Sequence, residues 1–296
     1  MVAATARTEP SKVVSSEPTT SCRPFHGVIV EVFGFPTGDW SIEAGGGYQD
    51  PNAFVNVARL ARDRHRLTGL IVPIVRTFNA RLGGLCDFST MFTPISCLRV
   101  RTGLEADGVL YLPPGWGIAF PSADCPTVVI WGQETGIVMA AHAGRDSLFD
   151  RAFASGIQNI REETWPIKSI ILRMLEWVKS FGEPSESIHV FSCVGIGAES
   201  YPHRFDDPRH GRANQRVWEY LKQRYGHNGA FVGENLDLHE LIRLQALCVG
   251  VPAENITRDR VDTYADTDSS GQPLYHSVRR EPGSKKRNLV FVAHLG

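Results

Sequence analysis

The 296-residue sequence predicts a mixed α/β fold, built as one domain in which mixed sheets are flanked by helices. Two observations favour this class. Short β-branched runs typical of strands intermix along the chain with amphipathic segments of helical spacing. No internal repeat is visible, and no linker splits the chain. We therefore expect one domain over residues 25–296 behind a disordered tail of residues 1–24.

The expected elements follow from local patterns. Runs rich in valine and isoleucine predict strands near residues 27–33, 70–75, 95–101, 107–112, 117–120, 127–131, 137–141, 188–194 and 289–293. Apolar residues at helical spacing predict helices over residues 51–66, 167–181, 212–225 and 238–249. Asp50-Pro51 supplies an N-cap and a first-turn proline for the first helix, and Asp237 with Glu240 forms a capping-box pattern at the last.

Composition excludes several classes of protein. The 31 basic and 32 acidic residues nearly balance, so nothing attracts the chain to nucleic acid or to a lipid surface. No apolar run approaches the roughly 20 residues that a membrane helix needs, and the N-terminal segment lacks the apolar core of a secretory signal. Six cysteines are too few for a disulfide scaffold in a chain of this length. We expect a cytoplasmic protein without nucleic-acid or membrane partners.

The clearest local feature is a hairpin that joins residues 127–131 to residues 137–141 through a polar turn. If the turn is centred on Gln133-Glu134, Cys125 before the first arm faces His142 after the second, with Cβ atoms about 4.5–5.5 Å apart. A thiolate and an imidazole at that separation can share a zinc ion. They can equally form an ion pair that makes Cys125 a nucleophile, or simply be packing residues.

Other polar groups could complete a site. The segment 192–197 runs from a strand into a glycine-containing turn where a ligand could approach the backbone. Histidines, arginines and aspartates cluster in residues 203–210, and Ser277–Arg280 carries paired arginines, whose forked guanidinium groups bind phosphate or carboxylate bidentately. Each of these segments is also readily explained as an ordinary turn or a solvated loop.

Taken together, these segments resemble the YfiH-type family, whose members are labelled laccase-domain or polyphenol oxidase-like and are also described as purine nucleoside phosphorylase and adenosine deaminase enzymes. Ser122–Val128 is similar to the family's TADC-x-PV motif, and Ala140–Gly144 matches its AxHAG motif at the usual spacing. Further matches follow in the same order: Glu105–Val109 (EADA), Pro114-Gly115 (PG), Ile196–Tyr201 (IGPxxYEV), Leu236–Ile256 (LDL…AGVPAENI) and Ser277–Arg280 (SYRRD).

The resemblance implies a YfiH-like fold with a zinc site made of one cysteine and two histidines, two of which are matched by Cys125 and His142. The family's QVHGxRV motif supplies the third ligand, and that position falls on Phe78, which cannot bind zinc. The family's tryptophan after HAG is Arg145 here, and a cysteine before the last strand region is Asp262. The sequence therefore differs from the family at the expected zinc-site positions, whereas the motifs expected to form the fold are retained.

The leading interpretation is an enzyme that acts on a purine nucleoside or a similar small molecule, with phosphate as a co-substrate and zinc as the cofactor. Its expected catalytic residues are Cys125, His142 and Asp124, and its expected substrate-binding residues are Arg279, Arg280 and Ser277. The missing zinc ligand could come from His203, His210, His276, Asp124 or Cys193.

Two alternatives stay open. One is a diverged relative that catalyses a different, metal-free biosynthetic reaction with Cys125 and His142. The other is a catalytically silent relative that binds a small ligand or a partner protein. A copper oxidase is the least supported interpretation, because one Cys-His pair falls far short of the several histidines that multicopper chemistry requires.

Overall fold

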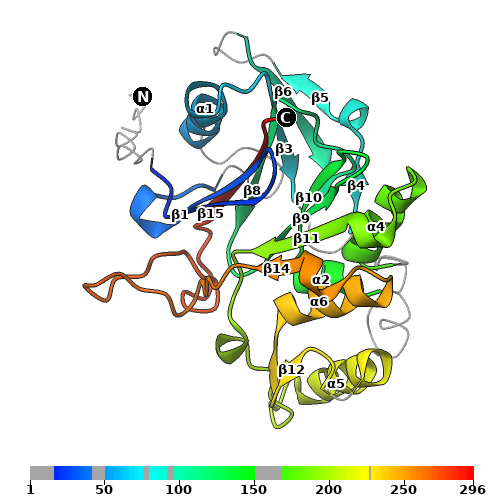
Figure 1. Cartoon of the computed structure of the whole chain (residues 1–296). Helices are drawn as coiled ribbons and strands as arrows, with labels where there is room; N and C mark the ends of the chain where they lie inside the picture. The colour runs from blue at the N-terminus through cyan, green and yellow to red at the C-terminus, as the bar shows by residue number, and fades with distance from the viewer. Residues whose placement is uncertain (1–16, 42–50, 76–79, 92–96, 151–167, 227) are drawn as a thin grey trace, which may run out of the picture.

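Two β-sheets pack face to face at the centre of the molecule, and helices cover both outer faces (Figure 1). The computed structural model describes residues 17–41, 51–75, 80–91, 97–150, 168–226 and 228–296. This arrangement confirms the predicted mixed α/β class. Within the described ranges, no helix is long and apolar enough to cross a membrane.

The larger sheet has seven strands in the order β1-β2-β15-β8-β3-β6-β5. In chain order they are β1 (Thr20–Phe25), β2 (Val28–Phe33), β3 (Gly69–Ile74), β5 (Ser89–Met91), β6 (Arg99–Glu105), β8 (Trp116–Ser122) and β15 (Asn288–His294). The sheet is mixed, because β3 runs parallel to both β6 and β8 while the other neighbours are antiparallel.

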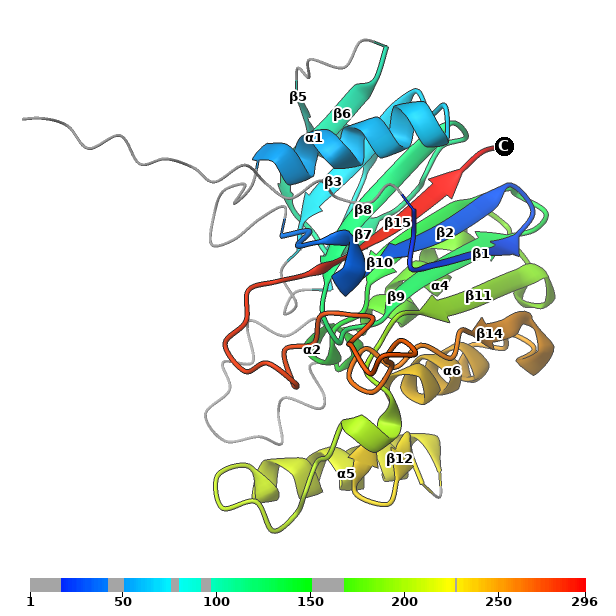
Figure 2. The same cartoon turned by 90° about the vertical axis from the view of Figure 1, so that its left-hand side faces the viewer.

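The second sheet has six strands in the order β14-β11-β9-β10-β7-β4. They are β4 (Leu82–Gly83), β7 (Gly108–Val109), β9 (Thr127–Gly132), β10 (Val138–His142), β11 (Ile188–Cys193) and β14 (Ile256–Arg258). A separate two-stranded ribbon joins β12 (Phe231–Val232) to β13 (Asn235–Leu236). Together with α5, this ribbon lies below α6 (Figure 2).

The helices are α1 (Pro51–Arg59), α2 (Arg145–Leu148), α4 (Ile170–Ser180), α5 (Gly211–Tyr225) and α6 (Leu238–Cys248). Short 3₁₀ turns are η1 (Phe35–Thr37), η3 (Leu85–Asp87), η5 (Ser185–Ser187), η6 (Ala198–Ser200) and η7 (Ala253–Asn255), and η2 (Leu60–Arg64) is a π-helical turn that continues α1. The predicted cap of α6 is confirmed, since the Asp237 carboxylate accepts a hydrogen bond from the backbone N–H of Glu240 at 2.9 Å.

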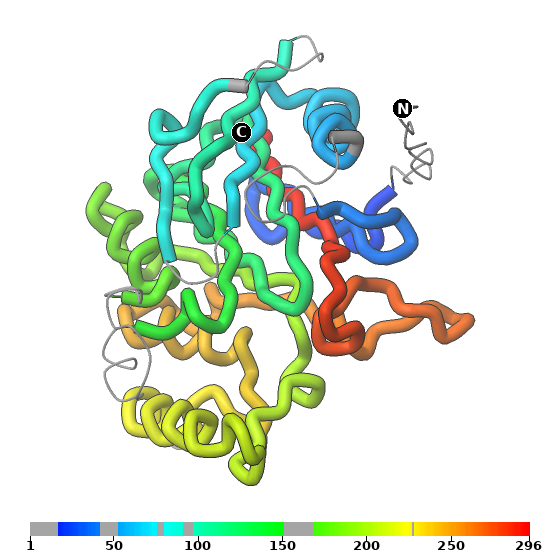
Figure 3. Tube along the Cα trace, turned by 180° about the vertical axis from the view of Figure 1, so that it is seen from behind, coloured from blue at the N-terminus to red at the C-terminus, as the bar shows by residue number. Residues whose placement is uncertain are grey.

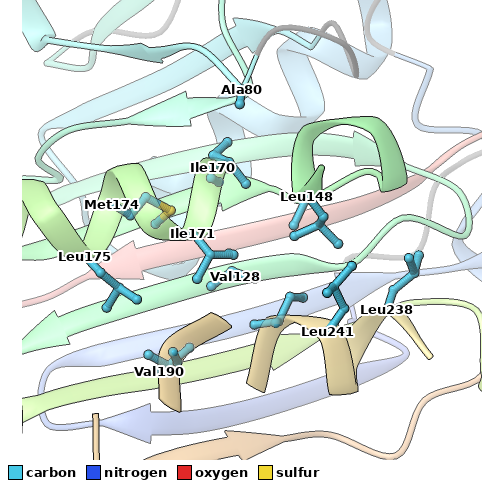
Figure 4. Packing of buried hydrophobic residues seen from close by; sticks show 14 of the residues in the cluster. Ala80, Val128, Leu148, Ile170, Ile171, Met174, Leu175, Val190, Leu238 and Leu241 are labelled. Atoms are coloured by element: carbon cyan, nitrogen blue, oxygen red, sulfur yellow. The ribbon is translucent and has the colours of Figure 1, made fainter. Parts of the chain in front are cut away.

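Three apolar clusters hold the layers together. The cluster between the six-stranded sheet and the helices includes Val128 and Val190 from the strands, Ile171 and Met174 from α4, and Leu241 from α6 (Figure 4). A second cluster fills the space between the two sheets, and a third lies between the seven-stranded sheet and α1. Alternate residues of each central strand therefore enter different cores, as the two-residue period of a strand requires.

The expected tail of residues 1–24 overlaps a strand, because β1 begins at Thr20. This short polar strand pairs antiparallel with β2 at the edge of the larger sheet, and Pro24 lies where the register shifts. The strand has few apolar residues. It is stabilised by its backbone hydrogen bonds to β2 and by the contact between the Thr20 and Tyr275 hydroxyl groups, which are 2.5 Å apart. A second boundary is also shifted: the strand expected over residues 95–101 is observed as β6.

Candidate active site

His142 ends strand β10 in a row of side chains that crosses the six-stranded sheet. It lies directly opposite Thr127 on β9, which in turn lies opposite Cys193 on β11. On its other side, the backbone N–H of His142 donates to the carbonyl of Asp107 at 2.7 Å, just before β7. Residues opposite one another point to the same face, so this row closes one end of the core between the two sheets.

Three polar atoms in this row are buried and have no hydrogen-bond partner among the described residues. They are His142 Nδ1, Thr127 Oγ1 and Asp107 Oδ1. Burial raises the pKa of Asp107 to about 7, against the opposing effect of the Arg81 and Ala80 backbone N–H groups. Buried polar atoms are rarely left unpaired without a reason. Their clustering therefore marks this end of the core as a place for chemistry.

The predicted pairing of Cys125 with His142 is wrong by two residues, because His142 faces Thr127. The turn is centred one residue later than expected: Gly132 donates to the carbonyl of Ile137 at 2.9 Å, and Gly136 takes a left-handed conformation with φ of +68°. A two-residue shift keeps the same side chains on the same face. Cys125 itself precedes β9, which begins at Thr127.

Cys125 lies in the loop between β8 and β9, and its side chain is half-buried. The ladder continues past the strand ends, since the N–H of Ala143 donates to the carbonyl of Pro126 at 2.7 Å. Cys125 directly precedes this last hydrogen-bonded residue, at the same end of the sheet as His142. The N–H of Arg145 also donates to the Cys125 sulfur.

The electrostatic surroundings favour the neutral forms of both groups. Burial, Asp124 and Asp146 together raise the pKa of the Cys125 thiol to about 12. Burial and the positive charge of Arg287 lower the pKa of His142 to about 4. A neutral thiol beside a neutral imidazole is not the thiolate–imidazolium pair that an unaided cysteine nucleophile requires.

Asp124 has a positioning role in this loop. Its carboxylate accepts hydrogen bonds from the Thr263 hydroxyl at 2.8 Å and from the Arg279 N–H at 2.9 Å, and its carbonyl accepts one from Ile196 at 2.8 Å. Asp124 also adopts a left-handed conformation with φ of +75°. These contacts tie three loops together beside Cys125. Two come from the long segment between β14 and β15, which Figure 3 shows extending to one side of the sheets.

The turn that follows β11 is joined to the same segment. The Asp262 carboxylate accepts a hydrogen bond from the Ser200 hydroxyl at 2.8 Å and others from backbone N–H groups of its own loop. A Cβ atom at Gly197 would lie 2.3 Å from the Asp262 Oδ2 atom, so this approach requires glycine. Asp262, where the sequence resemblance led us to expect a cysteine, therefore holds two loops together.

The three predicted substrate-binding residues separate into two groups. Arg280 donates to the carbonyls of Thr263, Tyr264 and Tyr275, and the buried Ser277 hydroxyl accepts from the Arg280 N–H at 3.1 Å. Both therefore hold the loop together. Arg279 is exposed, and its guanidinium lies 4.6 Å from the centre of the Tyr201 ring.

Sequence reasoning missed three residues that surround Cys125 and His142. The Arg145 side chain lies close enough to Cys125 and Tyr201 to interact electrostatically with both, and it pairs with Asp146 at 2.9 Å. Arg287, which precedes β15, influences Cys125 and His142 alike. Tyr201 is buried, which raises the pKa of its phenol, while Arg145 and Arg279 oppose that rise. Arg145 could have been noticed, since it directly follows the HAG motif.

The described residues offer two donors that suit zinc, the Cys125 sulfur and His142 with its unpaired Nδ1. They offer no third: no three His, Cys, Asp or Glu side chains among them are grouped to hold a metal ion. Of the proposed replacements, His203 packs on Tyr201, His276 contacts Gly38, His210 pairs with Asp207 and Cys193 lies in the core. Phe78, the position of the family's third ligand, lies outside the described residues.

Comparison with known proteins decides the family. A model of the family described as multi-copper polyphenol oxidoreductase laccase matches residues 90–294. The chain belongs to this family. A purine nucleoside phosphorylase of Bacteroides thetaiotaomicron is 24% identical over 187 residues, which cover 59% of this chain and 55% of that protein. The match thus spans about half the length of that relative.

Solved structures of the family share the fold. The hypothetical protein YfiH of Bacillus licheniformis superposes with a TM-score of 0.62 at 16% identity, covering 90% of this chain and 93% of that one. YlmD of Geobacillus stearothermophilus superposes with a TM-score of 0.62 at 20% identity, covering 96% of this chain and 99% of that one. These similarities establish a YfiH-like fold, as the sequence motifs predicted.

Proposed function

We propose that this family member cleaves purine nucleosides with phosphate, in the manner of a purine nucleoside phosphorylase. One observation carries the proposal: three arginines, Arg145, Arg279 and Arg287, surround the Cys125–His142 end of the inter-sheet core. Three guanidinium groups suit an anionic co-substrate such as phosphate. The unpaired polar atoms beside them can form hydrogen bonds to a neutral co-substrate such as a nucleoside. The relative from Bacteroides, which carries the phosphorylase name, supports the same reaction class.

In this reaction a phosphate oxygen forms a bond to C1′ of the ribose while the bond from C1′ to the purine nitrogen breaks. The electron pair leaves with the purine, which takes up a proton from water. Arg279 and Arg145 would hold the phosphate and offset its charge as the base departs. The phenol of Tyr201 is protonated at neutral pH, burial raises its pKa further, and it is available as a hydrogen-bond donor.

We also propose zinc as the cofactor, with Cys125 and His142 as two of its protein donors. Such an ion would supply Lewis-acid polarisation of an oxygen bound to it. Binding would require the Cys125 thiol to lose its proton, whereas the neutral imidazole of His142 is already in the metal-binding form. Zinc content and nucleoside cleavage are measured separately, so each proposal has its own test.

The test is incubation of the full chain with inosine, guanosine or adenosine, with and without phosphate, followed by chromatography of the products. Release of free base and ribose 1-phosphate only when phosphate is present supports the proposal. Formation of inosine and ammonia from adenosine would instead indicate a deaminase, and no reaction with any of the three nucleosides overturns it. Mass spectrometry of the purified protein for zinc addresses the cofactor.

Matched variants separate the site from general effects of substitution. Cys125→Ser and His142→Ala should lose activity, while Cys248→Ser and His210→Ala, which change exposed residues elsewhere, should not. Phe78→His distinguishes a protein that has lost the family's zinc site from one that forms the site with a different third ligand. If this variant gains both zinc and nucleoside cleavage that the parent lacks, the parent is a catalytically silent relative.

A further inference from the structure

A polar cavity lies at the far end of β15, on the outer face of the seven-stranded sheet. Its volume is about 430 Å³, and its polar lining comes from Ser21, Arg23, Glu31, Arg64, His65 and Arg66. Ile29 and Leu295 supply an apolar wall. The cavity lies between the β1–β2 hairpin and the C-terminal end of the α1–η2 helix, which Figure 2 shows lying across this sheet.

The floor of the cavity is a buried carboxylate. Glu31 is 2% exposed, in the middle of β2, and each of its oxygens has one cationic or imidazole partner. Oε1 accepts from Arg64 Nε at 2.9 Å, and Oε2 lies 2.9 Å from His65 Nε2. The His65 ring also stacks on Phe291 of β15, with ring centres 5.4 Å apart. These contacts hold both side chains in place around the cavity.

The local backbone is irregular in a way that serves this arrangement. Consecutive residues of a regular α-helix point about 100° apart and do not normally share one carboxylate. Here the π-helical turn η2 and the left-handed residue that follows it, Arg66 with φ of +55°, allow Arg64 and His65 to reach Glu31 together. Widened turns and non-glycine residues in this conformation cost energy and concentrate at functional sites.

The rim of the cavity is positively charged. Arg64 and His65 pair with Glu31, and Arg64 also pairs with the exposed Glu17 at 3.2 Å. The guanidinium groups of Arg23 and Arg66 are exposed and have no acidic partner among the described residues. Ser21, which lies opposite Glu31 in the β1–β2 pairing, adds a hydroxyl on the same face. Exposed guanidinium groups around a concave site suit a dianionic group such as a phosphate.

We propose that this cavity binds a small molecule carrying a phosphate monoester. Arg23 and Arg66 bind the phosphate, and the cavity volume, within the roughly 300–1,000 Å³ of small-molecule sites, accommodates the attached group. The site is separate from the Cys125–His142 site. Arg287 at the start of β15 acts on that pair and Leu295 at its end lines this cavity, so the seven-residue strand separates them by roughly 20 Å.

Calorimetric titration of the full chain with ribose 5-phosphate, and with ribose as the uncharged control, tests the proposal. We expect ribose 5-phosphate to bind and ribose not to bind. The double variant Arg23→Gln/Arg66→Gln should bind ribose 5-phosphate at least about tenfold more weakly, because two charge-assisted contacts are lost. Both side chains are exposed, so this variant should fold normally, which circular dichroism and the melting temperature would verify.

Two further variants make the result specific. Arg209→Gln/Arg212→Gln removes the same charge from exposed positions at the start of α5 and should leave binding unchanged. Arg279→Gln tests the other site: if it abolishes binding while Arg23→Gln/Arg66→Gln does not, the ligand sits near Cys125 and the proposal is overturned. Equal binding of ribose, or equal weakening in the α5 control, also overturns it. This test measures binding and not nucleoside cleavage, so its result does not depend on the proposed function.

Discussion

The two ends of β15 differ in whether the buried polar groups beside them have partners. At the end where Arg287 precedes β15, Asp107, His142 and Thr127 each bury a polar atom that has no hydrogen-bond partner among the described residues. Near Leu295, the buried Glu31 carboxylate is matched on both oxygens by Arg64 and His65. Buried polar atoms without a partner cost folding free energy, and a bound ligand can supply the missing hydrogen bonds. A buried charge that is already paired instead holds its neighbouring side chains in place. We propose catalysis at the first end and ligand binding at the second.

The largest effect is expected from His142→Ala at the catalytic end. Loss of this imidazole removes one of the two proposed zinc donors, and it should lower kcat/KM for nucleoside cleavage by about 10²- to 10⁴-fold, the usual contribution of a positioned polarising group. Steady-state kinetics measure the loss. Arg23→Gln/Arg66→Gln at the other end should retain full activity, and equal loss in both variants would erase the distinction between the two ends.

Asp124→Ala should cost about 2–4 kcal/mol of unfolding free energy, because the Thr263 hydroxyl and the Arg279 N–H lose their acceptor. Urea denaturation measures this. Asp124→Asn retains one acceptor oxygen and tolerates the left-handed conformation, so it should cost less. A double-mutant cycle with Thr263→Val should show coupling, and strictly additive effects would contradict the proposed tie between the loops.

Glu31→Gln should destabilise the protein by about 2–3 kcal/mol near neutral pH, because Arg64 and His65 lose the negative charge that they pair with in the buried interior. Burial raises the pKa of Glu31, but His65 and Arg64 outweigh that effect and hold it below the ordinary value of 4.5. A lowered carboxyl pKa stabilises the fold above pH 4.5, and this contribution is lost as pH falls through the folded-state value. Denaturation from pH 7 to pH 3 should therefore show the two proteins converging. A constant difference across this range would contradict the assignment.

Arg279→Gln should have the smallest effect on the fold, with at most about 1 kcal/mol lost with the Tyr201 contact. It should raise KM for phosphate about tenfold, since one charge-assisted contact disappears. Its neighbour is the matched control: Arg280→Gln removes donors to three backbone carbonyls and should lower the melting temperature instead. If Arg280→Gln changes KM and Arg279→Gln does not, their roles are reversed.

Local sequence predicted much of the scaffold. The apolar runs of β2, β3, β9, β10, β11 and β15 and the capped helix α6 formed where their patterns indicated. Strand β1 was not predicted, because its six residues show no apolar pattern and the strand is stabilised by pairing with β2. The hairpin was predicted but its register was not, because a one-residue change in the turn centre is set by the left-handed Gly136 and by the neighbouring strands.

The sequence alone determined the family motifs, the layers that the apolar periodicity implies and the presence of Cys125 and His142 at the same end of one hairpin. Only the tertiary structure decided which charged groups meet there. Arg145, Arg279 and Arg287 lie far apart in the chain and converge through loops that Asp124 holds together. The Glu31 cavity likewise joins three distant segments. Secondary structure follows from local periodicity, whereas long-range electrostatic contacts follow from packing, which no short stretch of sequence contains.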